Sequence, residues 1–313
     1  MPTLYNPFRK KGVFMIPAGG LGPSVSAAFS YAKSSYHQDE TDPTPTITGT
    51  TGGTFSATPS GLSINASTGT IDLSASTIQP YTITYTVDGV SANFSLSVTA
   101  SPFVANTFSF NFDAASSQYI DTGATPSDFN LPATTVTESD FSISFWYYFD
   151  ANEYYDPIIQ ATQSATNGFG IWQSGVNTAS LNFWVGHYSS GSLHTTQLSP
   201  SNWYHIACVF EGGATHTQKI YVDGVENNTV SYTTSRVIHS GKNCLIGGQT
   251  FQARYFDGKL DEFAIWNAAL GETAIQEIYN ATNNNTGKAL DLSTDYNNYT
   301  SSSNLQYWHR LGD

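Results

Sequence analysis

Apolar and polar side chains alternate along residues 27–100, and this alternation predicts short β-strands. The runs FSATPSG, LSINASTG, TIDLSAS, PYTITYTVDG and ANFSLSV are separated by turn-forming residues. Within YTITYTV the residues on one face are apolar, namely Tyr81, Ile83, Tyr85 and Val87, and threonines occupy the other face. A period of two with one apolar face is typical of a half-buried strand. The dipeptide Asp88-Gly89 that follows favours a tight hairpin turn.

Residues 101–313 repeat the strand pattern on a larger scale. In FSISFWYYF the residues expected on one face are Phe141, Ile143, Phe145 and Tyr147. Further candidate strands are FSFNFD, GFGIWQS, SLNFWVGHY, WYHIACVFE, QKIYVDG, NCLIGGQ and LDEFAIWN. One helix is predicted in GETAIQEIYNAT, where Ile275, Ile278 and Tyr279 recur at helical spacing. The chain is therefore expected to be all-β, with a small sandwich followed by a larger one and one short helix near the C-terminus.

Residues 1–26 differ from both parts, because Gly and Pro interrupt a segment with scattered aromatic and apolar anchors. The segment is too short and too broken for a core of its own, so we expect it to be an extended arm that docks on another surface, preferably a neighbouring subunit. Its candidate anchoring residues are Tyr5, Phe8, Arg9, Lys10, Lys11 and Phe14. The basic cluster is either a solvated turn or a contact with an acidic partner. The breaks in the apolar stretch argue against a secretory signal.

Charge is scarce in this chain and mostly negative. Charged residues make up 11% of the sequence, against roughly 25% for an average soluble protein, and the formal net charge is −13. No Lys or Arg occurs between Lys33 and Lys219. An acidic surface repels phosphate, so nucleic-acid binding is not expected. No apolar run reaches the length needed to span a bilayer, and no membrane insertion is expected.

The two cysteines, Cys208 and Cys244, lie in apolar strand-like runs. Two thiols are too few for a disulfide framework. We expect buried free thiols, with a single strand-to-strand disulfide as the alternative.

Four motifs in order make residues 101–313 resemble the laminin-G-like, concanavalin A-like jelly-roll family. They are the opening FNFDAASSQYIDTG, the strand FSISFWYYF, the pair WYHIACVFEGG and KIYVDGV, and the closing FDGKLDEFAIWNAALGETAIQEIY. The resemblance implies a two-sheet sandwich. It also implies a packed structural role for His205, where the family usually has a histidine. This fold serves lectins, glycanases, adhesion modules and virion proteins, so it does not fix the function.

Residues 27–100 resemble the Ig-like or cadherin-like repeats of bacterial and phage surface proteins. The stretch DPTPTITGTTGGTFSATPSGLSINASTGTIDLSASTIQPYTITYTV carries the likeness. Where the family often has a Cys, this chain has His37, so a family disulfide is absent. The resemblance implies a spacer without a catalytic site.

The sequence argues against catalysis. Glycanases on this fold place carboxylates at alternating positions of one strand, where they share a face. Asp261 and Glu262 are adjacent, and on a regular strand they point to opposite faces. No nucleophile elbow, H-E-x-x-H or C-x-x-C motif is present. We expect no enzyme.

A calcium ion is implied by the resemblance alone, because laminin-G-like sandwiches often hold one Ca²⁺ at the rim. By position in the family pattern Asp261 is the first ligand candidate, and Asp113 near the opening strand is the second. The alternative is that Asp261 only hydrogen-bonds the neighbouring turn. Hard cations prefer such oxygen ligands.

Aromatic side chains near loops are candidates for stacking on sugar rings, although aromatics at alternating strand positions mostly pack in cores. The candidates for glycan binding are Trp172, Trp184, His187 and Tyr188. Taken together, these features predict a structural phage virion protein, a capsid decoration, fibre or tail-associated component. Its arm would bind other virion proteins, and its jelly roll would face outward toward host surface glycans. Self-association is expected. The alternatives are a secreted bacterial adhesin or lectin, and a non-catalytic module of a polysaccharide-active enzyme.

Overall fold

The computed structural model describes residues 24–129, 140–150, 156–164, 167–174, 180–186, 192–233, 242–250, 252–284 and 287–311. The chain divides into two compact units, residues 1–101 and residues 102–313. Each unit has a hydrophobic core of its own. No α-helix within the described ranges has the length and apolar character that crossing a bilayer takes.

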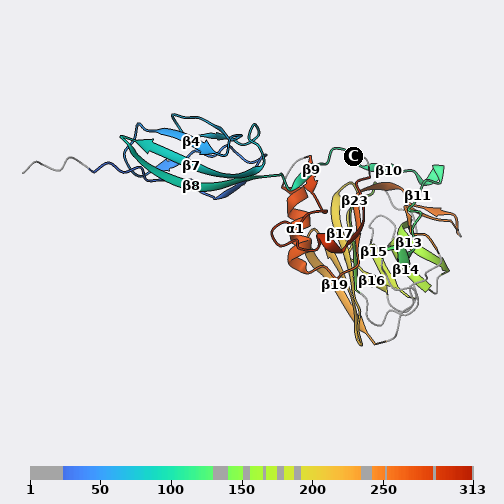
Figure 1. The fold of residues 1–313 in the computed structure, drawn as a ribbon. Helices are drawn as coiled ribbons and strands as arrows, with labels where there is room; N and C mark the ends of the chain where they lie inside the picture. The colour runs from blue at the N-terminus through green and yellow to red at the C-terminus, as the bar shows by residue number, and fades with distance from the viewer. Residues whose placement is uncertain are drawn as a thin grey trace, which may run out of the picture. The chain divides into compact units, whose positions relative to one another are not determined.

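The first unit is built from strands, of which β7 and β8 are the longest (Figure 1). They are β1 (Phe29–Ser30), β2 (Ser35–His37), β3 (Thr46–Ile47), β4 (Thr54–Thr58), β5 (Ser63–Ile64), β6 (Ile71–Asp72), β7 (Gln79–Val87) and β8 (Val90–Thr99). Four of them form a sheet in the order β2-β8-β7-β4, in which only the β2–β8 pair is parallel. The pairs β1–β3 and β5–β6 complete the unit.

The apolar face of YTITYTV lies in the core of the first unit, as predicted. Tyr81, Ile83, Tyr85 and Val87 are all buried in it. The turn between β7 and β8 contains only Asp88 and Gly89, with φ values of 48° and 79°. Positive φ at both central residues is what a two-residue hairpin turn of the favoured type requires.

The second unit consists of two large sheets, one α-helix and several short elements. Its strands are β9 (Phe103–Ala105), β10 (Phe110–Phe112), β11 (Ile120–Asp121), β12 (Phe141–Tyr148), β13 (Asp156–Ser164), β14 (Asn167–Ser174), β15 (Ser180–Val185), β16 (Ser192–His194), β17 (Trp203–Glu211), β18 (His216–Val222), β19 (Val225–Tyr232), β20 (Leu245–Ile246), β21 (Gly248–Gln249), β22 (Arg254–Tyr255), β23 (Gly258–Trp266), β24 (Lys288–Leu290) and β25 (Leu305–His309). The helices are α1 (Glu272–Asn283) and the 3₁₀ turns η1 (Ala114–Ser116), η2 (Pro126–Phe129) and η3 (Ser302–Asn304).

The two large sheets pack face to face. The seven-stranded sheet has the order β10-β23-β12-β17-β18-β19, with β25 also paired to β23, and the six-stranded sheet has the order β11-β20-β13-β14-β15-β16. The predicted face of β12 lies between them, because Phe141, Ile143, Phe145 and Tyr147 are fully buried in the shared core. The cysteines are buried there as free thiols, as expected.

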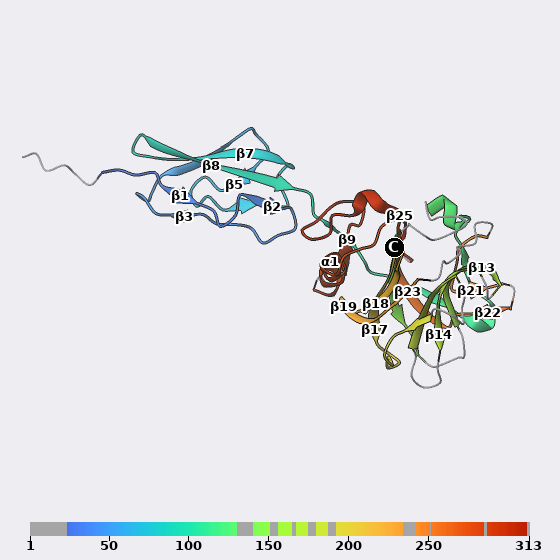
Figure 2. The ribbon, with the colours of Figure 1, turned by 90° about the horizontal axis from the view of Figure 1, so that it is seen from below.

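Helix α1 covers the other face of the seven-stranded sheet, which makes the second unit three layers thick (Figures 1 and 2). Its buried residues are Ala274, Ile275, Ile278 and Ala281, at the spacing of one helical face. Glu272 lies in the first turn, where a negative charge favours the helix. The helix was predicted from Ile275, Ile278 and Tyr279, and the structure confirms it.

Candidate functional site

The outer face of β12 carries polar and aromatic side chains toward helix α1. Since Phe145 and Tyr147 point into the core, alternation turns Ser144, Trp146 and Tyr148 to the outer face. Register then aligns them with residues of the neighbouring strands. Trp146 lies opposite Asp261 of β23 on one side and His205 of β17 on the other.

A second row of side chains lies two positions further along the same strands. Tyr148 is opposite Lys259 of β23 and Trp203 of β17. The Tyr148 and Trp203 ring centroids are 5.5 Å apart, and the Lys259 ammonium is 4.8 Å from the Tyr148 ring centroid. The Tyr148 hydroxyl donates a hydrogen bond of 2.7 Å to Asp150. We call Lys259, Tyr148 and Trp203 the outer row, and Asp261, Trp146 and His205 the inner row.

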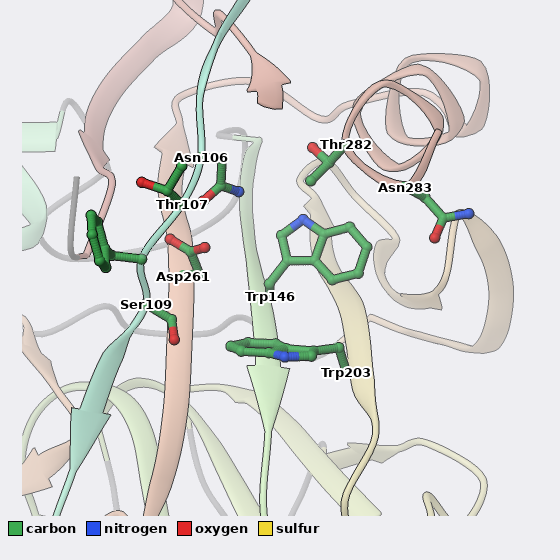
Figure 3. A pocket seen from close by; sticks show the side chains of 9 residues that line it. Asn106, Thr107, Ser109, Trp146, Trp203, Asp261, Thr282 and Asn283 are labelled. Atoms are coloured by element: carbon green, nitrogen blue, oxygen red, sulfur yellow. The ribbon is translucent and has the colours of Figure 1, made fainter. Parts of the chain in front are cut away.

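A groove of 370 Å³ opens where the helix ends beside the sheet (Figure 3). Its lining comes from the segment before β10, from β12, β17 and β23, and from the last turn of α1. The lining residues are Asn106, Thr107, Phe108, Ser109, Trp146, Trp203, Asp261, Thr282 and Asn283. The volume lies at the low end of the range for small-molecule pockets. This groove is the candidate functional site.

Two tryptophans form the aromatic wall of the groove. Figure 3 shows Trp146 between Asp261 and the helix end, with Trp203 seen edge-on beneath it. Trp203 is 39% exposed, an unusual position for so large an apolar side chain. Within the described part of the chain, neither indole N–H has a hydrogen-bond partner. Each indole therefore offers a ring face and a donor to a molecule in the groove.

The back of Trp146 is held by two other rings. Tyr279 of α1 stacks on it at a centroid distance of 5.8 Å, and His205 lies at 5.5 Å. His205 is fully buried, as the packed role predicted for it requires. Burial lowers the pKa of His205 to about 3, so its ring is neutral at ordinary pH. It serves as an uncharged packing surface rather than as a proton donor.

A β-bulge places both Asp261 and Glu262 on the helix side of the sheet. Asp261 is opposite Trp146 and Ala264 is opposite Ser144, so two residues of β23 face the single residue Phe145. Glu262 adopts a φ of 48° and lines a small enclosed space together with Ser144, Trp146 and His205. The prediction that adjacent Asp261 and Glu262 point to opposite faces is therefore wrong, because the bulge interrupts the alternation.

The two carboxylates have different surroundings. Glu262 accepts a hydrogen bond of 2.7 Å from the Trp308 indole and one of 3.1 Å from the Arg310 guanidinium. Asp261 is 7% exposed, accepts a hydrogen bond of 2.8 Å from the Glu262 backbone N–H, and lines the groove. Asp261 thus brings an acceptor to the groove, while Glu262 ties β23 to the C-terminal strand.

The groove combines aromatic faces with short polar groups. Thr107, Ser109 and Thr282 supply hydroxyls, and Asn106 and Asn283 supply amides. Such a set suits a ligand that has apolar ring faces and many hydroxyl groups, since stacking and hydrogen bonding are both available at short range. A strongly apolar ligand would displace water from these polar groups without offering hydrogen bonds in return, which costs free energy.

The structure places the predicted glycan-binding tryptophans elsewhere, on the outer face of the six-stranded sheet. Trp184 is fully buried and Trp172 is 9% exposed. A Cβ atom on Gly170 would lie 2.8 Å from the Trp184 Nε1 and 2.9 Å from the Trp172 Nε1, so both indoles crowd over this glycine. Neither ring is an exposed stacking surface in this structure. His187 and Tyr188 lie outside the described residues.

The predicted calcium ligands do not come together. Asp113 caps η1, and its carboxylate accepts hydrogen bonds from the Ala115 N–H at 2.9 Å and the Ser116 hydroxyl at 2.6 Å. Register places Asp113 four positions from the residue opposite Asp261, which is about 13 Å along the strands. Among the described residues no group of three or more His, Cys, Asp or Glu side chains could hold a metal ion. These two carboxylates do not fit a shared ion, and a calcium requirement stays a prediction.

The anchoring residues Tyr5, Phe8, Arg9, Lys10, Lys11 and Phe14 all lie outside the described residues.

Sequence reasoning missed Trp146 and Trp203 as site residues, although a signal for Trp146 was present. The alternation that assigned Phe145 and Tyr147 to the core also assigns Trp146 to the opposite face. A tryptophan that follows Ser142 and Ser144 on an outward face is unusual and marks a contact with something outside the core. Trp203 begins its strand, and no comparable signal distinguished it.

A family match and one solved structure agree with this architecture. Residues 121–276 match the family Laminin_G_3, described as the concanavalin A-like lectin/glucanases superfamily, which confirms the predicted jelly-roll domain for that range. A Bacteroides ovatus structure described as a "putative carbohydrate binding protein" is similar over 90% of this chain and 88% of its own, with 15% identity and a TM-score of 0.51. A heptameric pentraxin from Limulus polyphemus matches 56% of this chain and 80% of its own, with 16% identity and a TM-score of 0.39. No curated protein sequence matches the chain.

Proposed function

We propose that this protein is a non-catalytic carbohydrate-binding protein, and that its groove holds a hydroxyl-rich sugar. The observation that carries the proposal is that exposed Trp203, half-buried Trp146 and the Asp261 carboxylate line one groove. An indole face can stack on the apolar face of a sugar ring. A carboxylate can accept hydrogen bonds from two neighbouring hydroxyls. The likeness to a lectin-type fold supports this function.

The arrangement of the carboxylates supports binding without cleavage. Glycosidases need two carboxyl groups on opposite sides of the scissile bond, about 5–10 Å apart. Glu262 is engaged with Arg310 and Trp308, and it is the direct neighbour of Asp261 on one strand. The pair therefore stands on one side of the groove and does not flank a ligand.

The test is a glycan array probed with the full chain, followed by titration of each sugar that binds. Trp203→Ala should weaken binding at least tenfold while the second unit stays folded, because the side chain is 39% exposed and is not part of the buried core. Tyr119→Ala is the matched control, since Tyr119 is 41% exposed and lies outside the groove lining. Equal binding by both variants, or release of reducing sugar from a bound glycan, would refute the proposal.

We further infer that the protein is a structural component of a phage particle, exposed on the virion surface and assembled as a homo-oligomer. The order of its parts supports this role: a short basic arm precedes a small strand-built unit and then the binding unit. The arm would contact other virion proteins, because Arg9, Lys10 and Lys11 can pair with acidic groups of a capsid or tail. The binding unit would then reach host glycans.

Deletion of residues 1–26 tests this role. The truncated protein should keep the unfolding transitions of both units but should no longer enter particles. Normal incorporation of the truncated chain would contradict the anchoring role. Detection of the protein as a processed, exported polypeptide of bacterial cells would favour an adhesin instead.

A further inference from the structure

The outer row continues the groove along the same face of the sheet. Lys259, Tyr148 and Trp203 lie directly opposite one another on β23, β12 and β17. Trp203 belongs both to this row and to the groove lining. Lys259 and Tyr148 are half-buried, so each keeps part of its side chain open to solvent. The groove and the outer row therefore form one continuous surface.

The spacing of the two rows matches a chain of sugar units. Two positions along a strand correspond to about 6.6 Å, which is comparable to the length of one pyranose unit in a polysaccharide. The inner row offers Trp146 and Asp261, and the outer row offers Tyr148 and Lys259. Each row thus offers an aromatic ring of β12 and a charged group of β23, and Trp203 of the outer row also lines the groove.

The Lys259 ammonium has hydrogen-bonding capacity to spare. Its only contact within the described ranges is with the face of the Tyr148 ring, at 4.8 Å. An ammonium has three N–H donors, and a ring contact does not saturate them. Lys259 can therefore donate to the hydroxyl or ring oxygens of a sugar that leaves the groove over Tyr148.

The charges around the surface favour an uncharged ligand. Lys259 contributes one positive charge, whereas Asp261 lines the groove and Asp150 accepts the hydrogen bond of the Tyr148 hydroxyl. An acidic sugar would meet two carboxylates for one ammonium, on a chain whose formal net charge is −13. Like charges at such distances repel, so uronic acids and sulfated sugars are disfavoured.

We infer that the protein binds an uncharged oligosaccharide of at least two units, with one unit in the groove and the next against Tyr148 and Lys259. This inference rests on the proposed function, which requires only that one sugar unit binds in the groove. It adds a second subsite and the chemical class of the ligand.

The experiment compares sugars of increasing length on the full chain by titration calorimetry. The probes are glucose, galactose, mannose and xylose, their β-1,4-linked di- and trisaccharides, α-1,4-linked digalactose, and digalacturonic acid. For the sugar that binds, the disaccharide should bind about tenfold tighter than the monosaccharide, since each added ring contact contributes a factor of this order. Digalacturonic acid should bind more weakly than α-1,4-linked digalactose, its neutral counterpart with the same linkage.

Variants separate the two subsites. Tyr148→Ala should lower disaccharide affinity to the monosaccharide level and leave monosaccharide affinity within about twofold. Lys259→Met keeps an aliphatic side chain over the Tyr148 ring but removes the N–H donors. It should remove part of the higher affinity for the disaccharide. Trp203→Ala should weaken both ligands, and Tyr119→Ala should change neither.

The outcomes distinguish this inference from the proposed function. Equal affinity for the mono- and disaccharide would overturn the second subsite. So would a higher affinity for the disaccharide that survives both Tyr148→Ala and Lys259→Met. Either result would leave single-unit binding intact. Tighter binding of digalacturonic acid would overturn the assignment of an uncharged ligand. Failure of every probe, and of a broad glycan array, would remove the proposed function and this inference with it.

Discussion

The phenol ring of Tyr279 stacks on the indole of Trp146, with ring centroids 5.8 Å apart and planes inclined by 28°. This contact joins the only α-helix of the described residues to the aromatic wall of the groove. Trp146 is thereby supported from behind, and its exposed side faces the groove. The helix sets the shape of the site in addition to covering the sheet.

Removing the ring of Tyr279 is expected to loosen Trp146. Tyr279→Ala should weaken sugar binding roughly threefold to tenfold, because an aromatic pair contributes about 0.5–1.5 kcal/mol beyond its buried area. Calorimetric titration with the sugar that binds measures the effect. Tyr279→Phe keeps the ring and should bind like the natural protein; a similar loss in both variants would mean that the stack does not support the site.

The ion pair between Glu262 and Arg310 is expected to stabilise the second unit. Glu262→Gln should lower the free energy of unfolding by about 2 kcal/mol, since hydrogen bonds to a charged partner contribute about 1.5–3 kcal/mol and the Glu262 side chain is 6% exposed. Urea unfolding of the full chain measures it. Glu211→Gln is the matched control, because the Glu211–Lys219 pair is more exposed and should contribute less than about 1 kcal/mol. Equal losses in the two variants would contradict a special role for Glu262.

Acid is expected to destabilise the second unit partly through His205. Burial lowers the pKa of His205 to about 3 in the folded protein, whereas an unfolded histidine has a pKa near 6.5. Between these pKa values the unfolded chain binds a proton that the folded protein does not. The stability that His205 contributes by staying neutral is therefore present in full above about pH 6.5 and is lost as the pH falls toward 3. His205 contributes at most about 1.4 kcal/mol per pH unit to the slope of unfolding free energy against pH.

The variant His205→Phe isolates this effect. It replaces the imidazole by an apolar ring, and it should flatten the dependence of unfolding free energy on pH between 6.5 and 4. His194→Phe replaces an exposed histidine and is the matched control. An unchanged slope in His205→Phe would show that His205 protonates freely in the folded protein.

Asp113 is expected to stabilise the chain as a cap rather than as a metal ligand. Asp113→Ala should lower the free energy of unfolding by about 1 kcal/mol, the usual value for losing an N-terminal cap. The cost should be the same in calcium and in the presence of a chelator, as measured by thermal unfolding. A cost that grows severalfold in calcium would instead identify Asp113 as a ligand.

Much of the fold followed from the spacing of apolar residues. The buried faces of β7 and β12 were predicted from a period of two, and α1 was predicted from Ile275, Ile278 and Tyr279. These predictions succeeded because burial of one face is a local property that each strand or helix carries in its own sequence. The two-residue turn at Asp88-Gly89 was predictable for the same reason.

The candidate site depended on relationships that the order of residues does not contain. Trp146, Trp203 and Asp261 come from three strands, and only the register β23-β12-β17 brings them into one groove. The β-bulge that turns Asp261 and Glu262 to the same side cannot be recognised from alternation, because it breaks the alternation.

The sequence by itself determined that the chain is all-β and which faces of its strands are buried, because these properties arise from local periodicity. The jelly-roll domain followed instead from four motifs that resemble a known family. Only the tertiary structure decided which outward aromatic rings remain open. Trp172 and Trp184 are buried while Trp203 is exposed, although all three lie in or at the ends of similar strands. The reason is that exposure depends on what packs against each face, and α1 leaves the Trp203 end of its sheet uncovered.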